Sequence, residues 1–243
     1  MTSRDKILDR QIRKWELEKA VKAHERAAHE KPDALLAPVI TVSRQRGSSG
    51  TILAEKLAER FGYTLLHRDV IDRIVESSGY KRRIVESLDE HSKSQVQLWF
   101  ESMLQGAYVD ASDYVKELLE VIYSISQLGG VVVVGRGANF ILGPERGFHI
   151  RVVAPREVRI RALIEREQMS ERDALHEVER TDHERADFMR KVYGRSIDDP
   201  LAYDLVINNI SISMDSVTSL VAAAAQEKFE RMRTAELRLR QPV

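Results

Sequence analysis

Five short apolar runs, each followed by a longer segment with helical spacing of its apolar residues, constrain the fold of this chain more than any other feature. The run VVVVG is apolar at every position before its glycine, which is typical of a strand buried on both faces of a sheet. Strands that alternate with helices predict a parallel sheet, and five of them fit a doubly wound α/β domain with ligands at the carboxyl ends of the strands. The expected strands are Val39–Ser43, Tyr63–His67, Val131–Gly135 and the segments 148–154 and 203–209.

Composition excludes several other classes of protein. With 243 residues and an apolar fraction of 43%, the chain can form one substantial domain, with or without an appendage. Its 38 basic residues balance 38 acidic ones, so we expect no nucleic-acid partner. The absence of cysteine excludes disulfides, thiolate zinc sites and cysteine nucleophiles. No apolar stretch approaches the roughly 20 residues of a membrane span, and the charged N-terminus lacks a signal peptide, so we expect a cytoplasmic protein with no membrane association.

The N-terminal segment is expected to be an extra helix, from Thr2 to about Glu30, followed by a linker between Pro32 and Pro38. We therefore divide the chain into an N-terminal helix and linker, 1–37, and a main domain, 38–243. The helix either docks on the main domain or binds a partner, because Trp15 favours burial. The second interpretation predicts a possible homo-oligomer through this helix.

The segment RQRGSSG joins the first expected strand to a helix that begins near Thr51. The first backbone N–H groups of a helix lack partners and its dipole favours an anion, so this layout is typical of a phosphate-binding loop. Glycines allow the backbone to curl and to approach a ligand closely, and hydroxyl groups add donors. The expected phosphate-binding residues are Gly47, Ser48, Ser49, Gly50 and Thr51.

The loop departs from the phosphate-loop template G-x-x-x-x-G-K-[ST], because Gly50 stands where the template has lysine. Arg44 and Arg46 flank the turn instead, and a guanidinium group can bind phosphate oxygens through two parallel hydrogen bonds. The alternative is a tight turn between strand and helix that binds no ligand.

Three segments together resemble the cytidylate kinase-like family, relatives of the bacterial cytidylate kinases among the P-loop nucleoside monophosphate kinases. They are ITVSRQRGSSGTILAEKLAERFGYTLLHRDVI, VVVVGRGANFIL and AYDLVINN, and the resemblance covers about residues 39–230. It implies a P-loop NTPase-type sheet of five strands, ATP as phosphoryl donor and CMP or dCMP as acceptor. Relatives in this group tend to lack the loop lysine and to carry SR..GSGG, so Gly50 agrees with the group and Ser49 replaces a usual glycine.

The resemblance also implies roles for individual residues. Arg73 stands where an arginine of cytidylate kinases clamps the monophosphate. Arg136 matches the arginine of the GRD stretch after the third strand, whose aspartate is replaced here by Gly137. RTDHER corresponds to a stretch of the type R-D-D-R-D-R, so substrate-binding roles follow for Arg180, Asp182 and Arg185. Arg44, Arg46 and Arg136 are the expected catalytic cations, and Thr51 is the expected protein ligand of Mg²⁺ bound with ATP.

Residues 151–195 are rich in arginine, with Lys191 as their one lysine. Many of these arginines are explained by pairs with acidic residues one helical turn away, although the preference for arginine over lysine also suits oxyanion binding. Two helices joined by REQMSERD predict a short lid at about 165–172. Closure of this lid over ATP would exclude water from phosphoryl transfer. The lid would carry Arg159, Arg166 or Arg172 to the phosphates, and residue spacing does not decide which of the three.

Two further hypotheses compete with a nucleotide kinase. One is a catalytically weak or inactive nucleotide-binding module on the same fold, which the missing lysine and the missing aspartate favour. The other is a dinucleotide-dependent enzyme, which is disfavoured because no G-x-G-x-x-G motif follows the first strand.

Overall fold

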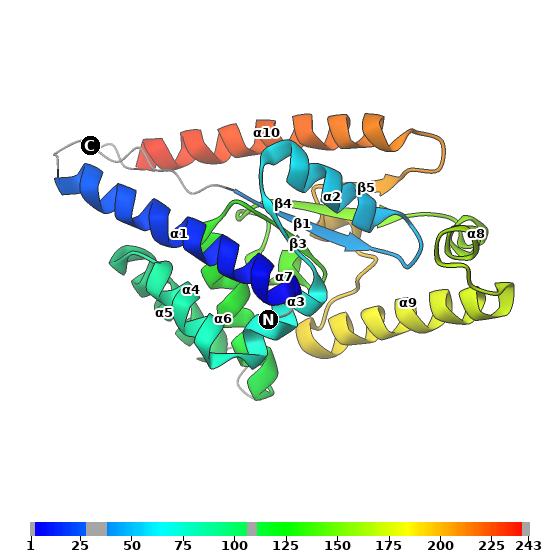
Figure 1. The fold of residues 1–243 in the computed structure, drawn as a ribbon, viewed down its shortest axis with the longest axis horizontal. Helices are drawn as coiled ribbons and strands as arrows, with labels where there is room; N and C mark the ends of the chain where they lie inside the picture. Colours follow the sequence, from blue (N-terminus) through cyan, green and yellow to red (C-terminus); the bar gives the residue numbers. More distant parts are fainter. Residues whose placement is uncertain (1–2, 28–37, 106–110, 240–243) are drawn as a thin grey trace. The chain divides into compact units, whose positions relative to one another are not determined.

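The structure is a computed structural model that describes residues 3–27, 38–105 and 111–239. Its main element is a five-stranded parallel sheet with the strand order β2-β3-β1-β4-β5 (Figure 1). The predicted five-stranded α/β fold is confirmed, and each expected strand overlaps an observed one. The strands are β1 (Val39–Arg44), β2 (Thr64–Leu66), β3 (Val131–Val134), β4 (Phe148–Val153) and β5 (Leu205–Asn208).

Strand β1 is central to the sheet. Ile40 pairs with Val132 of β3 on one side and with Phe148 of β4 on the other. All four residues of β3 are buried, as their uniformly apolar sequence predicts for a strand covered on both faces. Because β1 and β3 are neighbouring parallel strands, the segments that follow them leave the sheet at the same edge, where ligands of open α/β sheets bind.

The contacts within the chain group it into two compact units. One unit comprises Met1–Pro38 with Leu66–Gly130, and the other comprises Val39–Leu65 with Val131–Val243. The expected division into 1–37 and 38–243 stays a prediction, and the first unit combines residues from both parts. That unit also includes the helices between β2 and β3.

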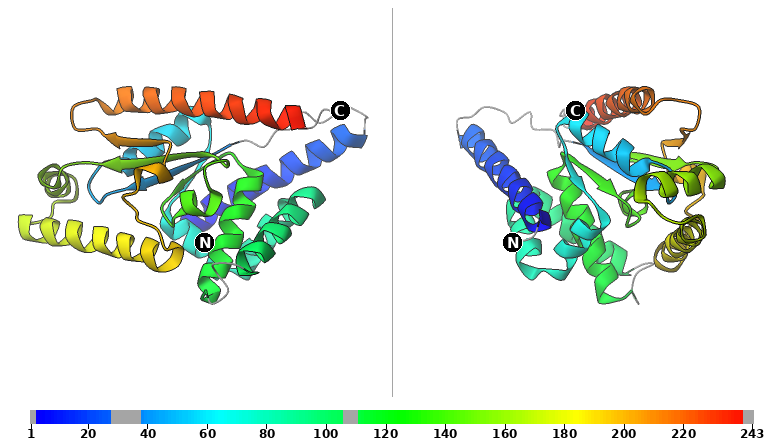
Figure 2. Two further views of the ribbon diagram at one scale, coloured as in Figure 1. Left: turned by 180° about the vertical axis from the view of Figure 1, so that it is seen from behind. Right: turned by 45° about the vertical axis from the view of Figure 1, so that its right-hand side comes forward.

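In the second unit, α2 (Gly50–Phe61) and α10 (Met214–Leu239) pack on one face of the sheet (Figure 2). Leu53 and Leu57 of α2 and Val217 and Val221 of α10 are buried against the apolar side chains of β1, β3 and β4. The helices α8 (Arg156–Glu167) and α9 (Glu171–Tyr193) form a hairpin. The short helix α7 (Ala138–Leu142) follows β3, and a 3-10 turn, Pro200–Ala202, precedes β5.

The α8–α9 hairpin has a small apolar core of its own, formed by Leu163, Ala174 and Val178. Ser170 caps α9 as expected, because its Oγ accepts a hydrogen bond from Asp173 N at 3.2 Å. The turn between the helices falls within the segment 165–172 that the sequence assigns to a lid.

The first unit is helical and includes the expected N-terminal helix, α1 (Ser3–Ala27). Leu8, Ile12 and Trp15 of α1 are buried, and Trp15 Nε1 donates to Gly129 O at 3.1 Å. Trp15 is thus buried within its own chain, and its burial requires no partner. The helices of this unit are α1, α3 (Arg68–Glu76), α4 (Ser78–Ser87), α5 (Glu90–Gln105) and α6 (Asp113–Leu128).

A histidine is buried in the sheet as a neutral group. His149 Nδ1 lies 2.8 Å from Thr41 Oγ1, and Nε2 lies 2.8 Å from Gly143 O, to which it donates. Burial lowers the pKa of His149 to about 4, and the charge of Lys228 acts in the same direction, while the Gly143 carbonyl and Asp204 oppose the shift. The neutral ring satisfies one donor and one acceptor, so protonation is disfavoured in the folded chain.

The stability of the protein should therefore fall in mild acid. Between pH 6.5 and 4 the unfolded chain binds a proton at this histidine that the folded chain excludes, which costs about 3 kcal/mol once the pH is below 4. His149→Gln removes this titration. We expect urea unfolding at pH 7 and at pH 4.5 to show a loss of stability that is about 2 kcal/mol larger for the wild type than for the variant. Equal losses in both proteins would contradict the role of His149.

Candidate functional site

The turn between β1 and α2 is closed by its own hydrogen bonds and by β4. Gln45 N donates to Val152 O at 3.0 Å, and Ala154 N donates to Gln45 Oε1 at 3.0 Å. Ser48 Oγ donates to Gln45 O at 2.9 Å and also lies 3.2 Å from Val152 O. The buried hydroxyl of Ser48 therefore supports the turn, and its backbone N–H also donates to Gln45 O, at 3.3 Å.

Gly47 and Gly50 occupy positions where no side chain fits. Gly47 has φ +82°, and a Cβ added there would lie 2.5 Å from Arg159 O. A Cβ on Gly50 would lie 2.5 Å from Arg44 Cβ and 3.1 Å from Val152 Cβ. The glycines allow the loop to pack against α8 and β4, a tertiary requirement in addition to the ligand approach expected from the sequence.

Helix α2 begins at Gly50 without a side-chain cap. Ser49 is its N-cap residue, has φ +64° and makes no capping hydrogen bond. Instead its Oγ accepts from Arg166 Nη1 of α8 at 2.8 Å. Thr51, the expected ligand of Mg²⁺, lies half-buried in the first helical turn. The backbone N–H groups of this turn and the positive end of the helix dipole provide the donors that a phosphate group requires.

Arg44 reaches from β1 toward the end of β3. Its Cβ lies beside Gly50, and its Nη1 lies 2.7 Å from the position that a Cβ would occupy on Gly135. The guanidinium group is thus placed where the adjacent strands β1 and β3 leave the sheet. Arg185 of α9 donates from Nη1 to Arg44 O at 2.7 Å, so a second predicted arginine is anchored at the same strand end.

Arg136 stands in the turn after β3 with the left-handed φ of +57°, flanked by Gly135 and Gly137. Tyr193 Oη donates to Arg136 O at 2.6 Å, and Arg136 Cζ lies 5.4 Å from the centre of the Phe188 ring. A Cβ on Gly137 would lie 2.2 Å from the Tyr193 ring. The aspartate that the family pattern has at this position would collide with Tyr193, which gives a physical reason for its replacement by glycine.

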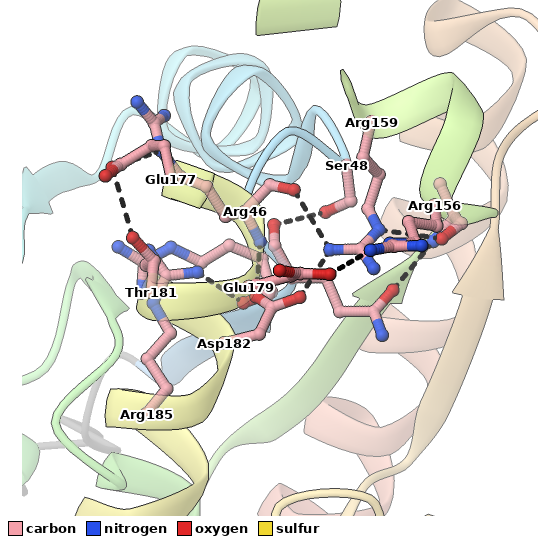
Figure 3. A network of polar contacts seen from close by, with 12 residues as sticks. Arg46, Ser48, Arg156, Arg159, Glu177, Glu179, Thr181, Asp182 and Arg185 are labelled. Carbon is pink, nitrogen blue, oxygen red and sulfur yellow. Dashed lines mark hydrogen bonds and ion pairs between the residues drawn. The ribbon is translucent and has the colours of Figure 1, made fainter. Parts of the chain in front are cut away.

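Arg46 points to the α8–α9 hairpin (Figure 3). Its Nη2 donates to Glu167 Oε2 at 2.6 Å and its Nε donates to Glu177 Oε1 at 3.1 Å. Burial opposes the charge of Arg46, but the two carboxylates outweigh burial and raise its pKa. Partial burial likewise opposes the charge of Glu177, whose pKa is nevertheless lowered by hydrogen bonds from Arg180, Arg46 and Thr181.

Two of the substrate-binding residues expected from RTDHER, Asp182 and Arg180, make different kinds of contact, one with the loop and one within α9. Asp182 Oδ1 accepts from Arg46 N at 2.8 Å and its Oδ2 pairs with Arg159 Nη1, so Asp182 contacts the loop (Figure 3). Arg180 instead pairs with Glu177 and Glu184, one helical turn away on either side. Arg180 therefore makes the local pairs that the alternative interpretation of the arginine-rich segment predicts.

Arg73, the expected monophosphate clamp, belongs to the first unit. It lies on α3, and its Nε donates to Asp5 Oδ1 of α1 at 3.2 Å. Tyr80 Oη also donates to Asp5 Oδ1, at 3.3 Å. These contacts connect α1, α3 and α4 within the first unit.

Metal coordination would need oxygen ligands from the loop and from a bound nucleotide. Within residues 3–27, 38–105 and 111–239, no three histidine, aspartate or glutamate side chains gather as a metal site. Mg²⁺ prefers one or two protein oxygens together with phosphate oxygens and water. The hydroxyl of Thr51 at the start of α2 fits that requirement.

Several contacts of the site are absent from the sequence-based expectations. Gln45 closes the turn, Arg166 reaches Ser49, and Tyr193 supports the Arg136 turn. Two of the three lid arginines contact the loop, namely Arg159 and Arg166, whereas Arg172 is exposed at the start of α9. Phe188 and Tyr193 are two aromatic residues shortly before Gly194, a signal that could have indicated packing at the end of α9.

A five-stranded parallel sheet whose central strand leads through a glycine-rich turn into a helix is an open α/β fold of the class that binds ligands at the carboxyl ends of its strands. The chain belongs to the cytidylate kinase-like family, whose model matches residues 39–211. This match confirms the predicted family and leaves α1 outside it. Membership in this family supports a phosphotransferase that handles nucleotides.

Curated relatives agree with this assignment, and one solved structure shares the fold. The chain is 26% identical over 186 residues to the cytidylate kinase of Pyrococcus horikoshii, which covers 76% of this chain and 87% of the relative. It is 27% identical over 184 residues to the cytidylate kinase of Staphylothermus marinus, covering 75% and 93%. An uncharacterized protein from Eubacterium ventriosum has the same fold, with a TM-score of 0.58, 20% identity and coverage of 78% and 98%. Among the described residues, no helix combines the length and apolarity needed to span a membrane.

Proposed function

We propose that this protein transfers the γ-phosphoryl group of ATP to a pyrimidine nucleoside monophosphate such as CMP or dCMP. The observation that carries the proposal is the position of Arg44, whose guanidinium group lies beside Gly135 at the end of β3. Arg44 Cβ lies beside Gly50 at the uncapped start of α2, and its fixed positive charge is proposed to take the place of the missing loop lysine. The naming of the curated relatives as cytidylate kinases supports the acceptor class.

Phosphoryl transfer requires positioning and charge stabilisation more than covalent chemistry by the protein. The backbone of Gly47–Thr51 is proposed to hold the donor phosphates, with Arg44 and Arg46 as cations near the transferred group. Arg136 and Arg185 are proposed to bind the acceptor phosphate, together with Arg180, and a role in acceptor binding for Arg73 of the first unit stays a prediction. Mg²⁺ bound with ATP would neutralise charge on the phosphate oxygens, and Thr51 is the residue proposed to hold it. A cytoplasmic location, where ATP and free nucleotides occur, fits this activity.

A coupled assay of ADP release across CMP, dCMP, UMP and AMP tests the proposal. We expect turnover with CMP or dCMP that exceeds turnover with AMP at least tenfold, a discrimination of about 1.4 kcal/mol. The second candidate function is nucleotide binding without turnover, and the packing of Gly137 against Tyr193 favours it because no aspartate fits there. Calorimetric binding of ATP or CMP without ADP release would support that candidate. Turnover without preference for a pyrimidine would contradict the proposed acceptor.

The role of Arg46 can be tested through the carboxylates that hold it. If Arg46 binds donor phosphates, it must leave Glu167 and Glu177, and the protein pays for that exchange on binding. The double variant Glu167→Gln with Glu177→Gln should therefore bind ATP about three- to tenfold more tightly in calorimetry. Glu179→Gln is the matched control, because Glu179 pairs with Arg156 across the same hairpin. Unchanged affinity in the double variant would assign Arg46 a structural role.

A further inference from the structure

The peptide groups of Arg46 are held on both sides by one partly buried ion pair, Arg159–Asp182 (Figure 3). Arg46 N donates to Asp182 Oδ1 at 2.8 Å, and Arg46 O accepts from Arg159 Nη1 at 3.3 Å. The same Nη1 pairs with Asp182 Oδ2, so the three residues form a closed ring of contacts. We name this ring, formed by Arg46, Arg159 and Asp182, the loop clamp.

Arg159 is the most buried member of the loop clamp, with 8% of its surface exposed. Its Nε donates to Ala154 O at 3.0 Å, which fixes the guanidinium plane. The next loop residue, Gly47, lies directly against Arg159 O. The side chain and the backbone of Arg159 therefore determine the path of the loop at two consecutive residues.

We propose that Asp182 and Arg159 are positioning residues that hold the loop in the conformation that receives the donor phosphates. The proposal rests on the proposed kinase function, and it differs from the acceptor contact that the family resemblance implies for Asp182. Each carboxylate oxygen of Asp182 already has a partner within the chain, one in the loop and one on α8. Because Asp182 lies on α9 and Arg159 on α8, the loop clamp also couples the loop to the hairpin.

A loop that is ordered before binding loses less conformational freedom when it takes up the donor, so preorganisation increases affinity. Asp182→Asn preserves the shape of the side chain but removes the charge-assisted bonds to Arg46 N and Arg159. We expect this variant to bind ATP at least tenfold more weakly in calorimetry. The Arg46 amide should exchange its hydrogen at least tenfold faster, and the KM for the acceptor should remain within twofold of the wild type.

Glu179→Gln provides the matched control. Glu179 pairs with Arg156 between the same two helices, but neither residue contacts the loop in the hydrogen bonds described above. ATP affinity and exchange of the Arg46 amide should remain within twofold in this control. Arg159→Lys is the second test variant, because lysine retains the charge but lacks the fork that reaches Ala154 O, Arg46 O and Asp182. In the double variant the loss of ATP affinity should be smaller than the product of the two single effects.

The experiment separates the positioning role from its alternatives. An Asp182→Asn variant with unchanged ATP affinity, unchanged exchange and a raised acceptor KM would overturn the proposal and place Asp182 in the acceptor site. Should Asp182→Asn fail to fold, Arg159→Lys with the same three measurements decides. Failure of the proposed kinase function would appear differently, as wild-type protein that binds no ATP. In that case hydrogen exchange of the Arg46 amide decides by itself whether the loop clamp orders the loop. Equal exchange rates in the wild type and in Asp182→Asn would refute that role.

Discussion

Gly47→Ala is expected to destabilise the protein by about 3 kcal/mol and to weaken ATP binding at least about a hundredfold. The new Cβ would lie 2.5 Å from Arg159 O, a backbone atom that no side-chain rotation can move away. The φ of +82° adds the strain of a left-handed conformation for a residue with a Cβ. Urea unfolding gives the loss of stability, and calorimetry with ATP gives the loss of affinity.

Gly62→Ala is the control that separates crowding from backbone strain. Gly62 also has a positive φ, +65°, but a Cβ there would meet nothing within 4 Å. This variant should lose only about 1 kcal/mol and should retain ATP affinity. If Gly47→Ala were no more destabilising than Gly62→Ala, the close approach of α8 to the loop would not hold in solution.

Arg136→Ala is expected to lower kcat about a hundred- to a thousandfold while the fold remains intact. Under the proposed function, Arg136 brings a cation to the acceptor phosphate, and truncation to alanine removes that charge. Loss of the contact with the face of Phe188 should cost about 1 kcal/mol or less of folding stability. Turnover in the coupled assay and urea unfolding measure the two effects.

Arg136→Gly is a second variant that removes the side chain without backbone strain. Arg136 has φ +57°, a conformation that glycine adopts without strain, so this variant should be at least as stable as Arg136→Ala and equally slow. Arg190→Ala, on the exposed part of α9 where Arg190 pairs with Asp187, should keep turnover within twofold. Wild-type turnover in either Arg136 variant would remove Arg136 from the site. In a binding module without turnover, the same variants should weaken monophosphate binding.

Arg44 and Arg46 have different contacts in the structure, and the sequence alone did not predict this difference. Two arginines that flank one turn receive the same interpretation from the sequence, namely cations beside a phosphate loop. In the structure Arg44 reaches Gly135 after β3, whereas Arg46 is held by Glu167 and Glu177. These carboxylates are 121 and 131 residues away in sequence, so no local pattern could have distinguished the two side chains.

The same limit applies to charged residues that the structure buries. Arg151 belongs to the arginine-rich segment, but it lies in β4 with 4% of its surface exposed. It donates to Ser43 Oγ at 2.9 Å and pairs with Asp198 at 2.5 Å. Local helical pairing explains Arg180 and Arg190, while the partner of Arg151 comes from a different strand and from the loop before β5. The type of residue predicted a cation, and the pairing of β1 with β4 together with the loop before β5 determined what it contacts.

The sequence by itself determined the elements whose cause is local. Apolar runs of β-branched residues specify the strands, the glycine-rich turn specifies the start of α2, and Ser170 specifies the start of α9, because each depends on neighbours within a few residues. Tertiary structure decided which arginines surround the loop, why Gly137 replaces an aspartate, and that Asp182 holds the peptide of Arg46. Those outcomes depend on the distances between segments that the parallel sheet brings together, and such distances are properties of packing that residue spacing along the chain does not encode.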